Sequence, residues 1–158
     1  MSIAVKLKDK VFGETLNVGE LIEGINDEMF NVDDIPVSIT TQEFSGDVVA
    51  IYKCKECEKI HLLGNNYSAE EDKDYAFDEE DLEEYLESNA KAIYGKNIPM
   101  NKIEILETLN KLSKKSPIVI GTFADEHPFT LTGVYKCSEE CPAIHLDSSY
   151  GEHSFNLN

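Results

Sequence analysis

Apolar residues recur at helical spacing in two stretches of the chain, and each stretch opens with an asparagine. The first stretch follows Asn17 and the second follows Asn101, with a glutamate three residues after each asparagine. This is the spacing of a capping box, in which the two side chains satisfy backbone groups of the first helical turn. The pattern predicts a helix over about residues 18–29 and a matching helix 84 positions later.

Shorter stretches alternate apolar and polar residues, which is typical of strands with one buried face. One strand follows Pro36, a second leads into a pair of cysteines and a third leaves it. Turns are expected at 45–47 and 64–66, and the same succession returns in the second half of the chain. The predicted strands are 37–41, 48–53 and 60–63 in the first half, and 117–120, 131–136 and 144–146 in the second.

The two halves are most alike around their cysteines. Residues 52–62 read Tyr-Lys-Cys-Lys-Glu-Cys-Glu-Lys-Ile-His-Leu, and residues 135–146 read Tyr-Lys-Cys-Ser-Glu-Glu-Cys-Pro-Ala-Ile-His-Leu. A match of this length indicates an internal duplication. We expect an α+β fold of two tandem helix plus β-hairpin repeats related by a pseudo-two-fold axis. Repeat 1, with an N-terminal strand, would span 1–67, an acidic helical insertion 68–97, and repeat 2 98–158.

The segment between the repeats has no counterpart. From residue 68 to residue 87 it holds eleven acidic residues and a single lysine. A helix is expected over 79–93, ending before Gly95, because its apolar residues form one stripe that would pack on the body. The stripe consists of Leu82, Tyr85, Leu86, Ala90 and Ile93. The opposite side, called the acidic face below, is the candidate partner-binding surface and carries Glu79, Glu80, Glu83, Glu84 and Glu87.

The charge of the whole chain narrows the choice of partner. The formal net charge is −17, and lysine supplies all the positive charge because arginine is absent. A phosphate backbone would repel such a chain, so direct binding of nucleic acid is not expected. A basic protein surface would be attracted instead, although acidic charge can also serve solubility alone. The sequence shows neither a membrane-spanning stretch nor an apolar signal core, so a cytoplasmic location is expected.

The repeats resemble a small domain of hypothetical phage and bacterial proteins, in which a short capped helix leads into a Pro-Val-x-Ile strand and then a hairpin. The resemblance covers 17–63 and 101–146 and implies the duplicated fold but no particular activity. The cysteine loops are also similar to half of a zinc ribbon. They depart from it because no glycine closely follows Cys57 or Cys141, and because three residues rather than two separate Cys137 from Cys141.

All four cysteines lie in the two repeated loops. Paired cysteines in a cytosolic protein are more often metal ligands than disulfides, and zinc prefers thiolate and imidazole ligands. We expect a structural zinc, either shared by the four thiolates or bound once per hairpin with histidines as further ligands. Free thiols and disulfides are the alternatives. The candidate ligands are Cys54, Cys57, Cys137 and Cys141, with His61 and His145 as possible additions.

Recognisable catalytic motifs are missing from the sequence. It has no phosphate-cradling glycine loop, no Gly-x-Ser-x-Gly and no His-Glu-x-x-His. We therefore expect a non-enzymatic binding protein whose acidic face occupies a basic groove of a host nucleic-acid-handling protein. A phage or mobile-element inhibitor, acting in anti-defence or host takeover in the host cytosol, is the concrete form of this hypothesis. The alternatives are a zinc-stabilised adaptor that binds through its sheet and a zinc enzyme with an open site.

Overall fold

Three helices and one sheet of nine strands are present in the part of the chain that the computed structural model describes, so the fold is α+β. The described residues are 3–5, 15–30, 35–40, 45–56, 59–66, 79–97, 99–122, 129–136, 138 and 143–147. The strands are β1 Ile3–Ala4, β2 Val37–Thr40, β3 Ser45–Cys54, β4 Ile60–Asn66, β5 Ala90–Lys96, β6 Ile118–Thr122, β7 Phe129–Thr130, β8 Gly133–Lys136 and β9 Ile144–Asp147. None of the described helices is long and apolar enough to cross a membrane.

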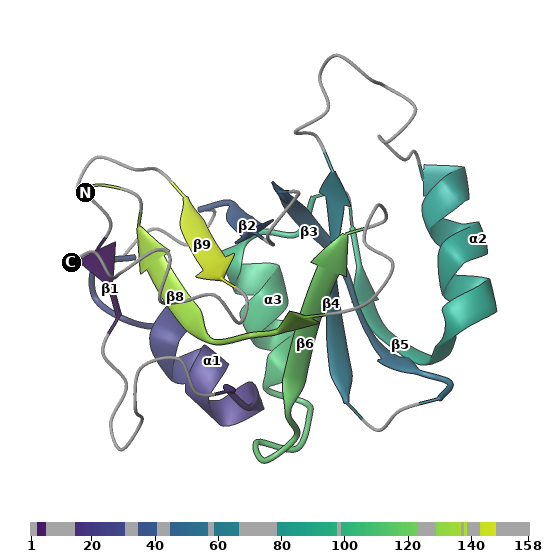
Figure 1. Cartoon of the computed structure of the whole chain (residues 1–158), viewed down its shortest axis with the longest axis horizontal. Helices are drawn as coiled ribbons and strands as arrows, with labels where there is room; N and C mark the ends of the chain where they lie inside the picture. Colours follow the sequence, from purple (N-terminus) through teal and green to yellow (C-terminus); the bar gives the residue numbers. More distant parts are fainter. Residues whose placement is uncertain are drawn as a thin grey trace.

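The sheet curls back on itself. Its strand order is β1-β8-β9-β2-β3-β4-β6-β7, with β5 added beside β3. Only Leu131 and Thr132 separate β7, at one end of this order, from β8, which is second from the other end. Figure 1 shows the resulting curvature, with α1 (Val18–Ile25) and α3 (Lys102–Leu109) on one side and α2 (Glu79–Asn89) on the other.

Both predicted capping boxes are present. Asn17 Oδ1 accepts a hydrogen bond from Glu20 N at 2.8 Å, and Glu20 Oε1 accepts one from Asn17 N at 2.9 Å. Asn101 and Glu104 make the same two bonds, each at 3.0 Å. These bonds satisfy backbone N–H groups that have no partner within the helix, so α1 and α3 begin where the sequence pattern predicted.

The main core lies between the sheet and the pair α1 and α3. Leu21, Ile25, Ile105 and Leu109 project from the two helices into it and are fully buried. Strands of both halves complete this core, so neither half encloses a core of its own. Burial of this apolar surface is the main favourable term in folding, at about 25 cal/mol per Å² removed from water. A smaller second cluster lies on the opposite face of the sheet under α2, and its buried members are Val49, Ala50, Tyr52, Leu63, Leu82 and Leu86.

The two halves of the chain are joined by strand pairings that run between them. β2 pairs in parallel with β9, aligning Val37 with Ile144, and β4 pairs in parallel with β6, aligning Ile60 with Ile118. Backbone hydrogen bonds repeat the pattern: Leu16 N donates to Leu131 O and Met100 N donates to Val48 O, both at 2.8 Å. Each half thus completes the sheet of the other.

Several predicted boundaries were wrong in informative ways. α1 ends at Ile25 rather than near 29, because the chain turns after Asn26 and Asp27 Oδ1 accepts a hydrogen bond from Met29 N. The expected turns at 45–47 and 64–66 are instead strand, since β3 and β4 pair along them. The helix predicted over 79–93 ends at Asn89, and the next residues form β5, which pairs with β3. Ile93 is therefore not on the buried stripe and is 48% exposed.

Candidate functional site

The acidic face is carried by α2, which packs on the sheet through its other side. Leu82 and Leu86 are four residues apart, lie on one side of the helix and are buried in the second cluster. Tyr85 and Ala90 pack at the margin of this cluster. The glutamates at 79, 80, 83, 84 and 87 are all exposed, as the sequence pattern predicted. The face is thus a negatively charged surface on an anchored helix.

Within the described part of the chain, Lys96 and Lys55 contact α2 near the acidic face. Lys96 Nζ lies 3.0 Å from Glu83 Oε1, and this pair is exposed to water. Lys55 Nζ donates to the backbone oxygen of Glu87 at 3.1 Å rather than to its carboxylate. Acidic residues in the first turn of α2 are favoured by the positive end of the helix dipole, but its last turn has no basic residue. The face therefore keeps most of its negative charge.

Tyr85 of α2 contacts Tyr52 of β3, which in turn stacks on His61 of β4. The rings of Tyr52 and His61 are stacked with centroids 4.9 Å apart, and the hydroxyl oxygens of Tyr52 and Tyr85 lie 3.3 Å apart. His61 is directly opposite Tyr52 in the β3–β4 hairpin and is buried. Burial and the nearby charge of Lys59 lower the pKa of His61 to about 4. His61 is therefore neutral at pH 7.

The second hairpin repeats this arrangement. Tyr135 is directly opposite His145, and their rings are stacked with centroids 5.1 Å apart and the same interplanar angle of 26°. Burial lowers the pKa of His145 as well. Both histidines are thus partly or fully covered strand residues that stack on a tyrosine, whether or not they also bind a metal.

The cysteines are only partly within the described residues. Cys54 ends β3, is half-buried at the margin of the second cluster, and its Sγ accepts a hydrogen bond from Glu56 N at 3.4 Å. Cys57, Cys137 and Cys141 lie outside the described residues. Among the residues that are described, no three histidine, cysteine or acidic side chains are placed to hold a metal ion. Zinc binding by the four cysteines therefore stays a prediction.

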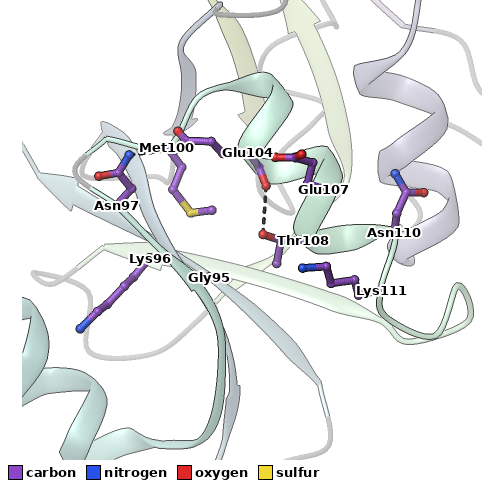
Figure 2. A pocket seen from close by; sticks show the side chains of 9 residues that line it. All are labelled: Gly95, Lys96, Asn97, Met100, Glu104, Glu107, Thr108, Asn110 and Lys111. Carbon is purple, nitrogen blue, oxygen red and sulfur yellow. Dashed lines mark hydrogen bonds between the residues drawn. The ribbon is translucent and has the colours of Figure 1, made fainter.

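A shallow, open hollow of about 550 Å³ lies between the end of β5 and α3 (Figure 2). Its lining carries both lysine and glutamate side chains, so it favours no one charge. Thr108 Oγ1 donates to Glu104 O and Asn97 Nδ2 donates to Glu104 Oε2, both at 2.9 Å. A Cβ on Gly95 would lie only 2.7 Å from Thr108 Oγ1. The hollow thus lies beside a close contact between β5 and α3. Glycine is needed at position 95 because a larger residue would clash with Thr108 in this contact.

Comparisons with known proteins give no further guide to this site. No protein-family model matches the chain, and neither a curated protein nor a solved structure matches it. The sequence pattern located the acidic face, but it missed β5 and the exposed side chain of Ile93. A β-branched residue and an aromatic residue at 93 and 94 were the available signal for a strand there.

Proposed function

We propose that the protein is a non-enzymatic binding protein whose acidic face engages a basic surface of a nucleic-acid-handling protein. The observation that supports this best is the exposure of all five glutamates on a helix anchored by Leu82 and Leu86. Carboxylates held on a packed helix present negative charge at fixed positions, as a nucleic-acid backbone does. A basic groove that normally binds phosphates would then attract and orient this surface.

Within this proposal the protein acts as an inhibitor. A surface that occupies a nucleic-acid groove excludes the nucleic acid by competition and needs no catalytic group. Such a role suits a phage or mobile-element protein that is directed against host machinery. It agrees with three features of the chain: extreme acidity, the lack of arginine and the lack of recognisable catalytic motifs. Binding that is insensitive to salt would instead favour the alternative, an adaptor that uses its sheet, because salt screens exposed charges.

Two variants with equal net charge test the proposal. The first carries Glu80→Gln, Glu84→Gln and Glu87→Gln on the acidic face. The second carries Glu23→Gln, Glu28→Gln and Glu107→Gln, which are also exposed but lie on α1, just after α1 and on α3. Wild-type and variant proteins are used to capture partners from host lysate at low and at high salt, and the captured proteins are identified by mass spectrometry.

We expect a basic nucleic-acid-handling protein to be retained by the wild type and the control variant at low salt. The face variant should bind it about tenfold more weakly, at roughly 0.5 kcal/mol for each exposed charge removed. Nucleic acid should displace the captured partner. If both variants retain the same partner as well as the wild type does, the acidic face only serves solubility and the proposal fails.

We further propose a structural zinc held by Cys54, Cys57, Cys137 and Cys141. Support comes from the repeated cysteine loops and from the N–H···S hydrogen bond at Cys54, which suits a thiolate acceptor. A closed thiolate site would stabilise the fold by on the order of 10 kcal/mol at neutral pH. Elemental analysis of protein purified without added metal or chelator should find zinc, and chelation should lower the unfolding temperature. Four freely titratable thiols in native, zinc-free protein would contradict this.

We propose finally that the halves arose by duplication and are related by a pseudo-two-fold axis. The sequence match is accompanied by reciprocal contacts between the halves. At the starts of the two capped helices, Val18 N donates to Ser116 O at 2.9 Å and Lys102 N donates to Ile35 O at 3.0 Å. At the starts of the matching strands β4 and β9, Ile60 N donates to Pro117 O at 3.0 Å and Ile144 N donates to Pro36 O at 2.9 Å. β1 also pairs with β8 as β5 pairs with β3. The repeat would then include the strand before each capped helix.

A further inference from the structure

β5 leaves one of its two edges without a hydrogen-bonding neighbour in the described part of the chain. It pairs with β3, and no other described strand pairs with it. In an antiparallel ladder, alternate residues direct their N–H and C=O groups away from the neighbouring strand. The free edge of β5 therefore presents a row of backbone donors and acceptors, which is a template for a further extended chain.

Ile93 adds an apolar contact at this edge. It is one of the exposed large apolar side chains of the described residues, at 48% exposure. Ile93 lies directly opposite Tyr52, and residues directly opposite each other in a sheet project to the same face. Since Tyr52 contacts Tyr85 of α2, Ile93 lies on the face of the sheet that carries α2. A side chain of an added strand could cover Ile93 there.

The acidic face borders the same edge. Lys96, the last residue of β5, contacts Glu83 of α2, while both side chains stay exposed, at 38% and 58%. Lys91 is the other cation of β5. These two lysines are outnumbered by the five glutamates of the acidic face, so the surroundings of the edge are negative. An added strand with positive side chains would be electrostatically favoured.

We propose that the free edge of β5 accepts an extended, lysine- or arginine-rich segment of the partner as an additional strand. An apolar side chain of that segment covers Ile93, and its cations face the glutamates of α2. This inference rests on the proposed function and specifies how the basic partner is held. A second copy of the chain is a poor occupant, because it would bring together two acidic faces and two chains of net charge −17.

A synthetic peptide provides the probe. A blocked nine-residue peptide has lysine at positions 1, 3, 7 and 9, valine at position 5 and threonine at the even positions, so its lysines and its valine project to one face of the strand. Two modified forms carry N-methyl groups on the nitrogens of either the odd or the even positions. Each modified form loses the donors of one strand edge only and keeps its charge. The parent peptide should bind at low salt and shift the backbone amide signals of β5 in NMR spectra. One modified form should bind at least tenfold more weakly than the other, because only one edge of the peptide faces β5.

Matched protein variants test the apolar contact. Ile93→Ala should weaken binding of the parent peptide three- to tenfold. Ile103→Ala removes a comparably exposed isoleucine (40%) on α3 and should leave binding unchanged. Equal effects of the two variants would contradict the role given to Ile93.

The outcomes separate this inference from the proposed function. If the peptide binds in a salt-dependent manner but both methylated forms bind equally well, strand addition is wrong while charge recognition by the acidic face stands. If the parent peptide does not bind at low salt, strand addition is wrong, and the capture experiment with the face and control variants decides the proposed function by itself. Unequal binding of the methylated forms, together with a specific loss in Ile93→Ala, supports strand addition.

Discussion

The two hairpins of the sheet share a Tyr–His stack but differ in what lies beside it. On the face that carries α2, the β3–β4 hairpin has Val49 and Leu63, both buried in the second cluster. The matching positions of the β8–β9 hairpin are Thr132 and Asp147, which are also buried but polar. Of the three described helices, α2 packs on the first hairpin, whose face is the apolar one.

This difference explains why only one of the two similar hairpins is covered on this face by a described helix. An apolar strand face is stable only when it is covered, and the apolar side of α2 provides the cover. A face with a threonine and an aspartate needs hydrogen-bonding partners instead, and an apolar helix side offers none. Two apolar positions on β3 and β4 thus determine which hairpin holds the acidic face.

The largest effect is expected when the first hairpin is made like the second. Leu63→Asp places a carboxylate against Leu82 and Leu86, where it has no compensating partner. We expect the free energy of unfolding to fall by about 3–5 kcal/mol. Hydrogen exchange should become faster in α2 than in α1 or α3, because the contact of α2 is the one that is broken.

Leu63→Met is the control for this substitution, since it keeps the volume and apolar character of the side chain. It should cost less than about 1.5 kcal/mol. If urea denaturation shows that Leu63→Asp costs no more than Leu63→Met, the apolar face is not what holds α2.

A smaller effect is expected from the titration of His61. Its pKa is about 4 in the folded protein and near 6.5 in the unfolded chain, so the unfolded chain binds the proton first as the pH falls. The stability due to neutral His61 is therefore complete above pH 6.5 and is lost progressively between pH 6.5 and 4. Between pH 7 and 5 the loss should reach about 2 kcal/mol.

His61→Phe keeps a ring beside Tyr52 and removes the titrating group, so its unfolding free energy should depend less on pH over this range. His145→Phe should show a change of the same sign, because burial also lowers the pKa of His145. Denaturant titrations at pH 7 and pH 5 measure both. Equal pH dependence of the wild type and His61→Phe would contradict the assignment.

The smallest effect concerns the two capping boxes, which both halves share. Asn17→Ala and Asn101→Ala should each lower the free energy of unfolding by about 1 kcal/mol. The two values should agree within about 0.5 kcal/mol, because the capping bonds have nearly the same lengths. A measurable cost at one helix only would show that the similar geometries are energetically unequal.

Local features of the fold were the ones that the sequence predicted. The capped starts of α1 and α3 depend on residues three apart, and both hairpins join strands close in sequence, so the relevant signals lie in short windows. Leu21, Ile39 and Leu146 are buried as their alternation or helical spacing indicates. In the candidate site, the exposure of the five glutamates followed from the same helical period.

Features that depend on distant partners were missed. Ser45 and Asp47 read as a turn, yet both extend β3 because β2 and β4 pair along it. Ala90 and Ile93 fit the helical stripe of α2, but the edge of β3 recruits them into β5. No local window contains such a partner, so periodicity alone favoured the longer helix. The environment of Ile93, and with it the proposed strand-addition edge, required the tertiary structure.

The pairing of β1 with β8 has a consequence for how the chain folds as it is made. Ile3 aligns with Lys136, and β2 aligns with β9 near the end of the described residues. A nascent chain that has emerged only as far as β4 lacks the neighbour of β1 and one of the two neighbours of β2, so it exposes unpaired strand edges. Contacts this distant in sequence slow folding, since a long loop must close before they form. The sheet should therefore assemble mainly after β9 has been synthesised, with the two halves folding as one kinetic unit.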